Sequence, residues 1–571
     1  ALIERRRGLA WSLLAFAALA KGFPIFAAPV FVLYELEMTA EGGVRAAIRA
    51  AMRPILTGLA WLAGVIGAVT LVVTLFAGWG SVLHTITYHA GRGAEIESLY
   101  ASFALALAWL PGLAAQTAFH PADLSRVVIS PLIPEAPLET VSTALLGLAL
   151  LLGLAALWMG WRTRTRRQSV VGAQTPASEW VSRARQALAA GVVLMTLAFI
   201  LTFRALPAHY LLDVLPLAPL LWLGTRRRSA LWLGGVIGVG VFGQILVASS
   251  VWRSLVALQP LAVLTLEARN ACWVVAAGAL LVAAWRGLAA KVARAGKSSV
   301  EFAPSAPPLR VRARETWRRL IASAPPIPGF QPRSEDVFAH LFAQVSPRLA
   351  IAGAGMISLI CYAGLVADFQ LTLYFNQPHT TAGTTHINDM GAITGYSPLA
   401  AAGFVMVILL LFGAQFIALL AASRAQREDG AAASRLTALL IFGAPVVFTL
   451  VMIWMQPVTT TDLYGYIARG YLSVNLHGNP MTTPASLLPG GYVVDRPASP
   501  YGPGWLLIAG LFSWISGQNR LLNMLLFKAV AGLCVLVAIA LVDQLAKRLY
   551  HARRLRIAVL FGWSPLLFFE S

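Results

Sequence analysis

Long apolar runs, separated by short polar segments, recur along the whole chain of 571 residues. The hydrocarbon core of a membrane is about 30 Å thick and takes roughly 20 apolar residues per helix. On that criterion we expect roughly 11–14 membrane-crossing segments. The pattern therefore predicts an all-α fold, a polytopic transmembrane helical bundle. The clearest runs are 54–79, 138–160, 187–204, 229–250, 270–285, 348–366, 398–423, 436–457 and 523–546.

The composition agrees with this pattern. Of the residues, 58% are hydrophobic and only 12% are charged, whereas soluble domains carry about 25% charged residues. The 44 Lys and Arg outnumber the 24 Asp and Glu, which gives a net charge of +20. The basic residues stand in short loops between apolar runs, as the positive-inside rule describes, and form no stripe interleaved with base-stacking aromatics. The predicted partner is therefore the lipid bilayer, and no nucleic acid is expected.

One long polar segment divides the chain. Residues 286–345 are basic and rich in Pro, Ala and Ser, which is typical of a cytoplasmic linker. We call residues 1–285 the first half and residues 346–571 the second half. The sequence starts at Ala1 directly before an apolar run and stops at Ser571 directly after one. We therefore expect it to be an internal piece of a longer chain.

Two apolar segments depart from a simple series of crossings. If 502–517 and 523–546 both crossed, the basic cluster that follows them would lie outside, against the positive-inside rule. We therefore expect 523–546 to span and 502–517 to be an interfacial or re-entrant helix at the outer face. Residues 9–34 have basic flanks on both sides, which predicts a hairpin turning at Lys21–Pro24. Lys21 then either faces protein, water or an anion, or snorkels from a helix end.

Polar chemistry concentrates in the predicted outer loop 458–501. Asp462 lies shortly beyond a predicted helix, where a carboxylate can accept a proton from a hydroxyl nucleophile. Arg469, His477 and Arg496 can stabilise a departing phosphate. Outer loops of transporters are also polar, however, and interfacial tyrosines commonly serve as aromatic belts. The tyrosines that suit a sugar or a lipid headgroup here are Tyr464, Tyr466, Tyr471 and Tyr501.

The stretches "TTTDLYGYIARGYLSVNLHGNP", "VVDRPASPYGPGWLLIAGLFSWISG" and "WSPLLFFES" resemble the bacterial polyprenol-phosphate-mannose-dependent α-mannosyltransferases of the GT-C superfamily. The resemblance covers roughly 345–571. In that family an acidic residue is followed by a G-x-N-P-type turn and by S-P-Y-G-P before an interfacial helix. Asp462, Gly478–Pro480 and Ser499–Pro503 stand at those places. The resemblance implies Asp462 as the catalytic general base. The substrate-binding residues that it implies are Tyr464, Arg469, His477, Asn479, Asp495, Arg496 and Tyr501.

The first half resembles the C-terminal part of another GT-C group, glycosyltransferase family 87. The matching stretches are "LAKGFPIFAAPVFVLYE", "YHAGRGAEIESLYA" and "LPAHYLLDVLPLAPLLWL". The chain then resembles the tail of one such enzyme joined to the head of another, as a tandem fusion or a gene-joining artefact. From the residues alone, Glu95 and Glu97 beside Arg92 are equally well read as an outer-loop ion pair. The resemblance implies roles near a lipid-phosphate site for Lys21, Arg92, Glu95, Glu97, His209 and Tyr210.

Together these resemblances imply an integral-membrane glycosyltransferase with extracytoplasmic active-site loops in a bacterial cell membrane. It would move mannose, with inversion, from a polyprenyl-phosphate donor to a glycan or glycolipid acceptor. The donor is a substrate, so no cofactor is expected. The cysteines and histidines show no ligand-like spacing, so no metal site is predicted. The alternatives are a lipid or oligosaccharide flippase and a non-catalytic membrane scaffold.

Overall fold

The computed structural model describes most of both halves but little of the linker between them. Its main described ranges are 6–21, 23–39, 44–83, 95–107, 115–120, 125–129, 135–171, 252–295, 345–371, 397–428, 435–457, 462–481, 503–549 and 551–569, with a few residues between 188 and 243 and the single residues 483 and 499. The predicted span 229–250 lies almost wholly outside these ranges, and the span 187–204 lies partly outside them.

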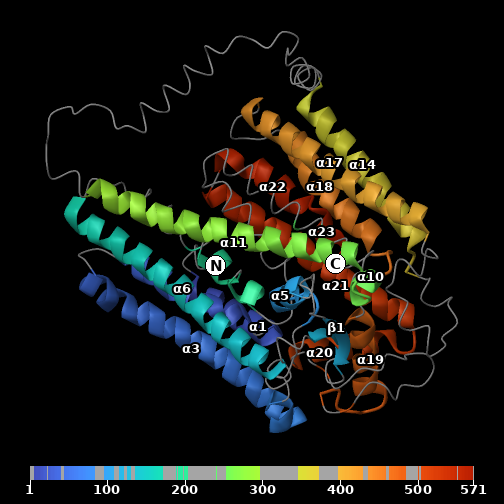
Figure 1. Ribbon diagram of the computed structural model, residues 1–571, viewed down its shortest axis with the longest axis horizontal. Helices are drawn as coiled ribbons and strands as arrows, with labels where there is room; N and C mark the ends of the chain where they lie inside the picture. The colour runs from blue at the N-terminus through green and yellow to red at the C-terminus, as the bar shows by residue number, and fades with distance from the viewer. Residues whose placement is uncertain are drawn as a thin grey trace.

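The first half consists mainly of long helices (Figure 1). A short antiparallel hairpin, in which Gln116 pairs with Ile129 and His120 with Ser125, is the one sheet among the described residues. The elements are α1 (Arg7–Lys21), η1 (Phe23–Ala27), α2 (Ala28–Met38), α3 (Val44–Ala77), α5 (Leu99–Leu107), β1 (Gln116–His120), β2 (Ser125–Ile129), α6 (Glu135–Val171), α10 (Trp252–Val256) and α11 (Pro260–Ala295).

The chain reverses direction between α1 and α2. The Nε of Arg7, at the start of α1, donates to both carboxylate oxygens of Glu35 in α2, at 2.9 and 3.0 Å. Residues 28 positions apart can meet in this way only if the intervening chain turns back. The short helix η1, with Pro24 inside it, makes that turn. This confirms the hairpin that the basic flanks of 9–34 predicted.

The second half is also helical. Its first helix begins at Pro347, where the Ser346 side chain accepts a hydrogen bond from the backbone N–H of Leu349 at 3.3 Å, as an N-cap does. The elements are α14 (Pro347–Asp368), α17 (Pro398–Glu428), α18 (Arg435–Met452), α19 (Asp462–Asn475), α20 (Pro503–Ser516), α21 (Arg520–Leu549), η5 (His551–Arg553), α22 (Arg554–Gly562) and α23 (Pro565–Phe569).

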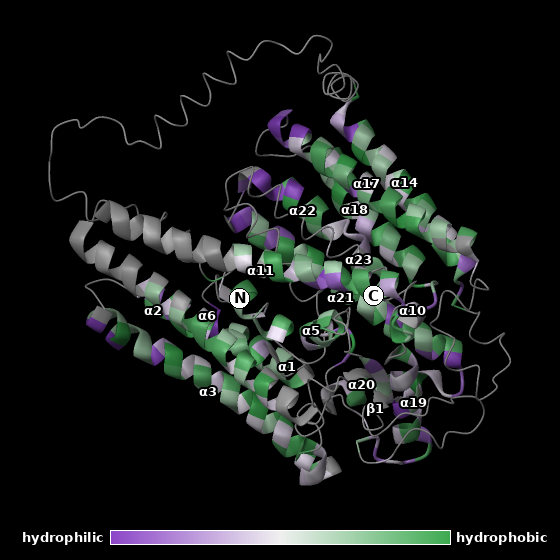
Figure 2. Cartoon of the chain, viewed as in Figure 1, coloured by the Kyte–Doolittle hydropathy of each residue, from purple (hydrophilic) through white to green (hydrophobic). Residues whose placement is uncertain are grey.

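Within the described residues, five helical segments are long and apolar enough to cross a membrane. They are Arg45–Leu75, Pro347–Asp368, Ala402–Glu428, Arg435–Met452 and Arg520–Arg548. Figure 2 shows the apolar middles of these helices and the more polar ends of α17 and α22. The predicted all-α, polytopic membrane fold is thus confirmed. Helix α18 ends at Met452, five residues before the predicted end of its apolar run.

The second half has two opposite polar ends. At one end, Leu371 donates its backbone N–H to Trp454 and Gln456 donates to Phe369, both at 2.8 Å, so the chain leaves α14 and α18 on the same side. At the other end, the Gln426 amide donates to the His551 carbonyl at 2.9 Å, which joins the end of α17 to the segment after α21. We call the first the outer end and the second the basic end, because Arg424, Arg427, Lys547, Arg548 and Arg553 lie in the basic end.

Helix α20 is too short to cross the membrane. Its 14 residues extend over about 21 Å, against a hydrocarbon core of about 30 Å. Helix α21 follows after a three-residue turn and has the length of a full crossing. The lengths therefore agree with the expectation that 523–546 spans and 502–517 does not.

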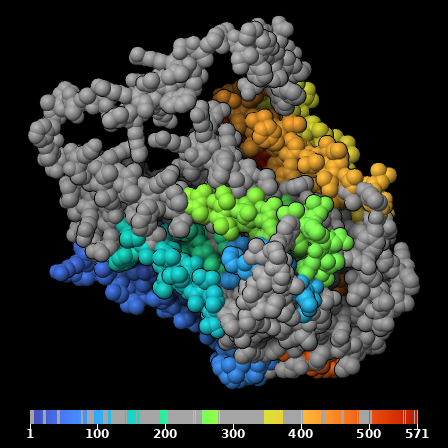
Figure 3. Space-filling model, in the orientation of Figure 1, coloured from blue at the N-terminus to red at the C-terminus, as the bar shows by residue number. Residues whose placement is uncertain are grey.

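The two halves share one core. The largest buried cluster contains residues of both halves, and its partly buried margin includes Phe26 and Leu146. Figure 3 shows α11 between α6 of the first half and the α14–α17 pair of the second half on one face of the molecule. In membranes such packing is stabilised by close van der Waals contact between helices. Buried members of this cluster are Val193, Phe199, Ile200 and Trp273 of the first half and Ile351, Tyr362, Phe448 and Phe568 of the second.

Candidate functional site

Helix α19 carries the predicted catalytic residue at its first position. Asp462 opens the helix, where an acidic residue is favoured by the positive end of the helix dipole. It follows the end of α18 by ten residues and so belongs to the outer end of the second half. The backbone of Asp462 is described, whereas its side chain lies outside the described part. Position 469 follows two helical turns later on the same side of α19.

Two predicted substrate-binding residues of α19 are buried. Arg469 is 3% exposed and Tyr464 is 5% exposed, and both make polar or ring contacts with their surroundings. Arginine is almost never fully buried unless its charge is matched by other groups. Arg469 is therefore held within the fold and is not a freely moving surface cation.

A small residue allows α19 to approach α20 very closely. A Cβ atom built on Gly470 would overlap the backbone of Ala509 and stand 2.5 Å from Oγ of Ser513. Ser513 in turn accepts a hydrogen bond from the amide of Asn523 in α21, at 3.1 Å. The three helices thus form a tightly packed unit.

Aromatic rings complete this three-helix unit. Tyr466 of α19 meets Trp505 of α20 edge-on, with ring centroids 5.0 Å apart. Both also contact Phe527 of α21, at centroid distances of 5.8 and 5.9 Å. Such edge-to-face pairs are favourable beyond the area that they bury. Tyr466, which the sequence offered as a sugar contact, packs mainly against these rings.

The two short motifs that follow α19 meet in space. Ser499, the first residue of the S-P-Y-G-P stretch, donates its backbone N–H to the Pro480 carbonyl at 2.7 Å and is fully buried. The Asn479 side-chain oxygen accepts the N–H of Met481 at 3.0 Å, which closes the turn. His477 is exposed and takes a φ of 52°, a left-handed conformation uncommon for a residue other than glycine. Gly478–Pro480 and Ser499 are therefore parts of one structure.

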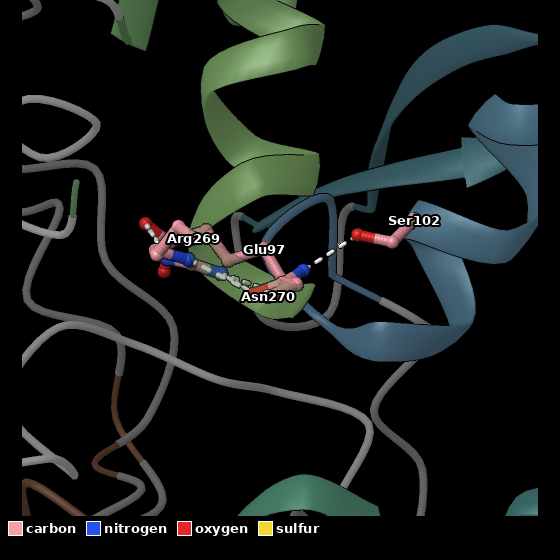
Figure 4. A network of polar contacts seen from close by, with 4 residues as sticks. All are labelled: Glu97, Ser102, Arg269 and Asn270. Carbon is pink, nitrogen blue, oxygen red and sulfur yellow. Dashed lines mark hydrogen bonds and ion pairs between the residues drawn. The ribbon is translucent and has the colours of Figure 1, made fainter. Parts of the chain in front are cut away.

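A second polar network lies in the first half, around Arg269 near the start of α11 (Figure 4). Its guanidinium donates to the backbone carbonyl of Glu97 at 2.5 Å and to the side-chain oxygen of Asn270 at 2.7 Å. Asn270 donates to the Ser102 hydroxyl, also at 2.5 Å. Arg269 is 1% exposed, so these bonds and nearby carboxylates compensate the cost of burying its charge.

Glu95 and Glu97 belong to this network. Both are buried, and Oε1 of Glu97 lies 4.0 Å from a guanidinium nitrogen of Arg269. Burial raises the pKa of Glu97 from 4.5 to about 7; Arg269 acts against this rise and Glu95 adds to it. An ion pair of these acids with Arg92 was one of two interpretations of the sequence, and Arg92 lies outside the described residues. The residues missed from the sequence are Arg269, Asn270 and Ser102, and the available signal was the stretch "EARN", with three polar residues within an apolar run.

Several predicted site residues cannot be placed relative to Asp462. Lys21 is the last residue of α1, and its side chain is outside the described part. Their roles therefore stay predictions. Among the described residues, no group of three or more His, Cys, Asp or Glu could hold a metal ion. The predicted site residues that lie outside the described residues altogether are Arg92, His209, Tyr210, Asp495, Arg496 and Tyr501.

Comparison with known proteins gives a family match within the second half of the chain. No curated protein and no solved structure matches the sequence. Residues 361–571, less than half of the chain, match the family model described as the alpha-(1->6)-mannopyranosyltransferase N-terminal domain. The match contains α19, the Gly478–Pro480 turn, Ser499 and α20. The resemblance to membrane mannosyltransferases that the sequence indicated is therefore confirmed for the second half.

Proposed function

We propose that this protein is a membrane mannosyltransferase that takes mannose from a polyprenyl-phosphate donor. The acceptor is a glycan or glycolipid on the extracytoplasmic side of a bacterial cell membrane. The match of 361–571 to a mannopyranosyltransferase domain supports the transferase class. The observation that carries the site is the position of Asp462, at the outer end of the helical bundle and at the start of a helix packed against α20.

The proposed reaction is a direct displacement with inversion. The Asp462 carboxylate takes the proton of the acceptor hydroxyl while the hydroxyl oxygen of the acceptor bonds to the anomeric carbon of mannose. The bond between that carbon and the phosphate oxygen breaks, and the polyprenyl phosphate leaves with the electron pair. No further reactant is required, because the donor already carries an activated sugar and its own leaving group.

The developing charge on the departing phosphate needs stabilisation, which preorganised cations and donors supply well. Arg469 is a candidate because it lies in the same helix as Asp462 and is fixed by burial. His477 and Asn479 follow within the turn that ends this helix. Asp495, Arg496 and Tyr501 are proposed contacts from the loop before α20. For Lys21, Arg92, Glu95, Glu97, His209 and Tyr210 we propose a lipid-phosphate contact from the first half.

The test is Asp462→Asn in the full-length protein, assayed with radiolabelled polyprenyl-phosphate mannose and a membrane glycolipid extract. Loss of a general base lowers the rate by about 100- to 10,000-fold, and Asp462→Glu should retain part of the activity. Asp368→Asn is a matched control, because Asp368 is an exposed acid at the outer end of α14. Transfer by Asp462→Asn at the wild-type rate would rule the assignment out. Flipping of labelled lipid without any transfer would favour the flippase.

A further inference from the structure

A hydrogen bond joins the first half to the turn that follows α19. Nδ2 of Asn479 donates to Oγ of Ser81, at 3.4 Å, across nearly 400 residues of sequence. Ser81 lies just beyond α3, after Gly78, whose φ of 79° ends that helix. Ser81 is 1% exposed and Asn479 is half-buried, so this contact is partly shielded from water. The same Asn479 closes the turn through its side-chain oxygen.

Apolar side chains surround this hydrogen bond. Val73 of α3 forms a buried cluster with Met481 of the turn and Leu506 of α20, and Val69 and Val82 pack against it. The end of α3 therefore contacts both the turn and helix α20. Close packing of this kind fixes the position of a turn better than a hydrogen bond alone, because it removes room for movement.

The first and second halves also contact each other at places away from Ser81 and Asn479. Leu545 of α21 packs against the first-half cluster that contains Ala10, Val30 and Tyr34. Trp273 of α11 belongs to the same core as Tyr362 and Phe448 of the second half. The two halves therefore meet near the C-terminal end of α21 as well as beside the turn.

From this we infer that the first half is a positioning module for the site of the second half, with Ser81 as the positioning residue for the Gly478–Met481 turn. This inference rests on the proposed function, because the turn adjoins the helix that Asp462 begins. The hydroxyl of Ser81 holds the Asn479 amide, and Asn479 in turn holds the turn that is joined to Ser499.

The contact itself can be tested without measuring transfer. A protease site is inserted into the linker of the full-length protein, and the two halves are separated on a denaturing gel after cleavage. With Ser81→Cys and Asn479→Cys together, a short bifunctional thiol reagent should join the halves. Each single cysteine variant is the matched control and also reports any reaction of the native cysteines. Absence of the joined product in the double variant overturns the inference.

The positioning role is tested by kinetics. Ser81→Ala should lower kcat of mannose transfer about tenfold, with an unchanged melting temperature, and Ser81→Thr should restore most of the rate. Thr265→Ala is the control, because the Thr265 hydroxyl is exposed and bonds Leu261 of its own helix. A wild-type rate in Ser81→Ala overturns the positioning role. A wild-type protein that forms the cross-link but transfers no mannose overturns the proposed function and leaves the contact between the halves standing.

Discussion

Gly470 of α19 lies directly against the backbone carbonyl of Ala509 in α20, with no room for a side chain between them. Small residues commonly permit such close approach between membrane helices, where packing contacts replace the hydrophobic effect as the main attraction. The distance between α19 and α20 is therefore set at this glycine. Since Asp462 and Arg469 belong to the same helix, the contact also fixes where the candidate site stands relative to α20.

Replacement of Gly470 by alanine should destabilise the protein. The added methyl group would overlap the Ala509 carbonyl, which is backbone and cannot rotate away, and would crowd the Ser513 hydroxyl. Overpacking of this kind costs about 1–3 kcal/mol. We expect a lower melting temperature in detergent, measured by intrinsic tryptophan fluorescence, together with reduced transfer.

Gly510 of α20 provides the matched control. It faces the same helix pair, but a Cβ there would meet only Val474 at an ordinary distance of 3.6 Å. Gly510→Ala should be neutral, or stabilising by up to about 1 kcal/mol because alanine favours the helix. Equal losses in the two variants would show that the helices do not approach most closely at Gly470.

Much of this fold can be predicted from the sequence because membranes restrict what an apolar run can do. The spans and the short helix 502–517 follow from length and from the placement of basic residues. The pairing of Arg7 with Glu35 cannot be predicted in this way, because it depends on how two helices of the hairpin rotate about their axes. The end of α18 at Met452 is set by backbone pairing with the segment after α14, which hydropathy does not report.

The candidate site also has parts that the sequence predicts and parts that it does not. Asp462 and the Gly478–Pro480 turn carry a recognisable local pattern, and the match of 361–571 supports them. The polar residues around Arg269 can be seen in the sequence, but its bond to Glu97 cannot, because the two residues are 172 positions apart. The contact of Ser81 with Asn479 is equally a product of tertiary packing. Chemistry that depends on distant segments needs the folded chain.

Asp543 should be important for stability at the basic end. Its carboxylate accepts hydrogen bonds from Arg554 at 2.5 and 3.0 Å, and Nζ of Lys547 lies 3.0 Å away. The Asp543 side chain is 9% exposed, so its neutralisation would leave two cations without their nearest anion. We expect Asp543→Asn to lower the free energy of unfolding by about 1–3 kcal/mol, measured by denaturation in mild detergent.

The exposed pair of Arg424 and Glu428 is the comparison. Its atoms lie 3.8 Å apart, and the Glu428 side chain is 55% exposed. Water screens such a pair, so Glu428→Gln should have little effect on stability. A loss as large as that of Asp543→Asn would mean that net charge at this end, and not the specific bonds of Asp543, stabilises the fold.

Glu97 should make stability depend on pH. Its pKa is raised from 4.5 to about 7 in the folded protein, mainly by burial. Between these values the folded state binds more protons than the unfolded state, so stability falls as pH rises from about 5 to about 7. This loss of stability is complete above the folded-state pKa of Glu97 and amounts to at most about 3 kcal/mol.

Glu97→Gln isolates this contribution. Glutamine has nearly the same shape but cannot ionise, so the difference in melting temperature between wild type and variant should change across pH 5 to 8. Glu95 and Arg269, which face Glu97, and Glu267, which lies near Arg269, remain in both proteins. A difference that stays constant across this range would show that Glu97 keeps its charge throughout.

The ends of α20 should both lie on the outer side of the membrane. A helix of 14 residues cannot cross, and it connects to α21 through a turn at the outer end. Single cysteines at the exposed positions Gly504 and Gln518 should react with a membrane-impermeant maleimide in intact cells, as should one at Leu476. Cysteines at Glu428 and His551, at the basic end, should react only after the membrane is opened. The protein without an introduced cysteine reports the background of Cys272, Cys361 and Cys534.

If positions 504 and 518 reacted from opposite sides, α20 would cross the membrane. The chain would then cross the membrane twice between α19 and the basic end, once in α20 and once in α21, instead of once. The basic end would lie outside, on the same side as Asp462.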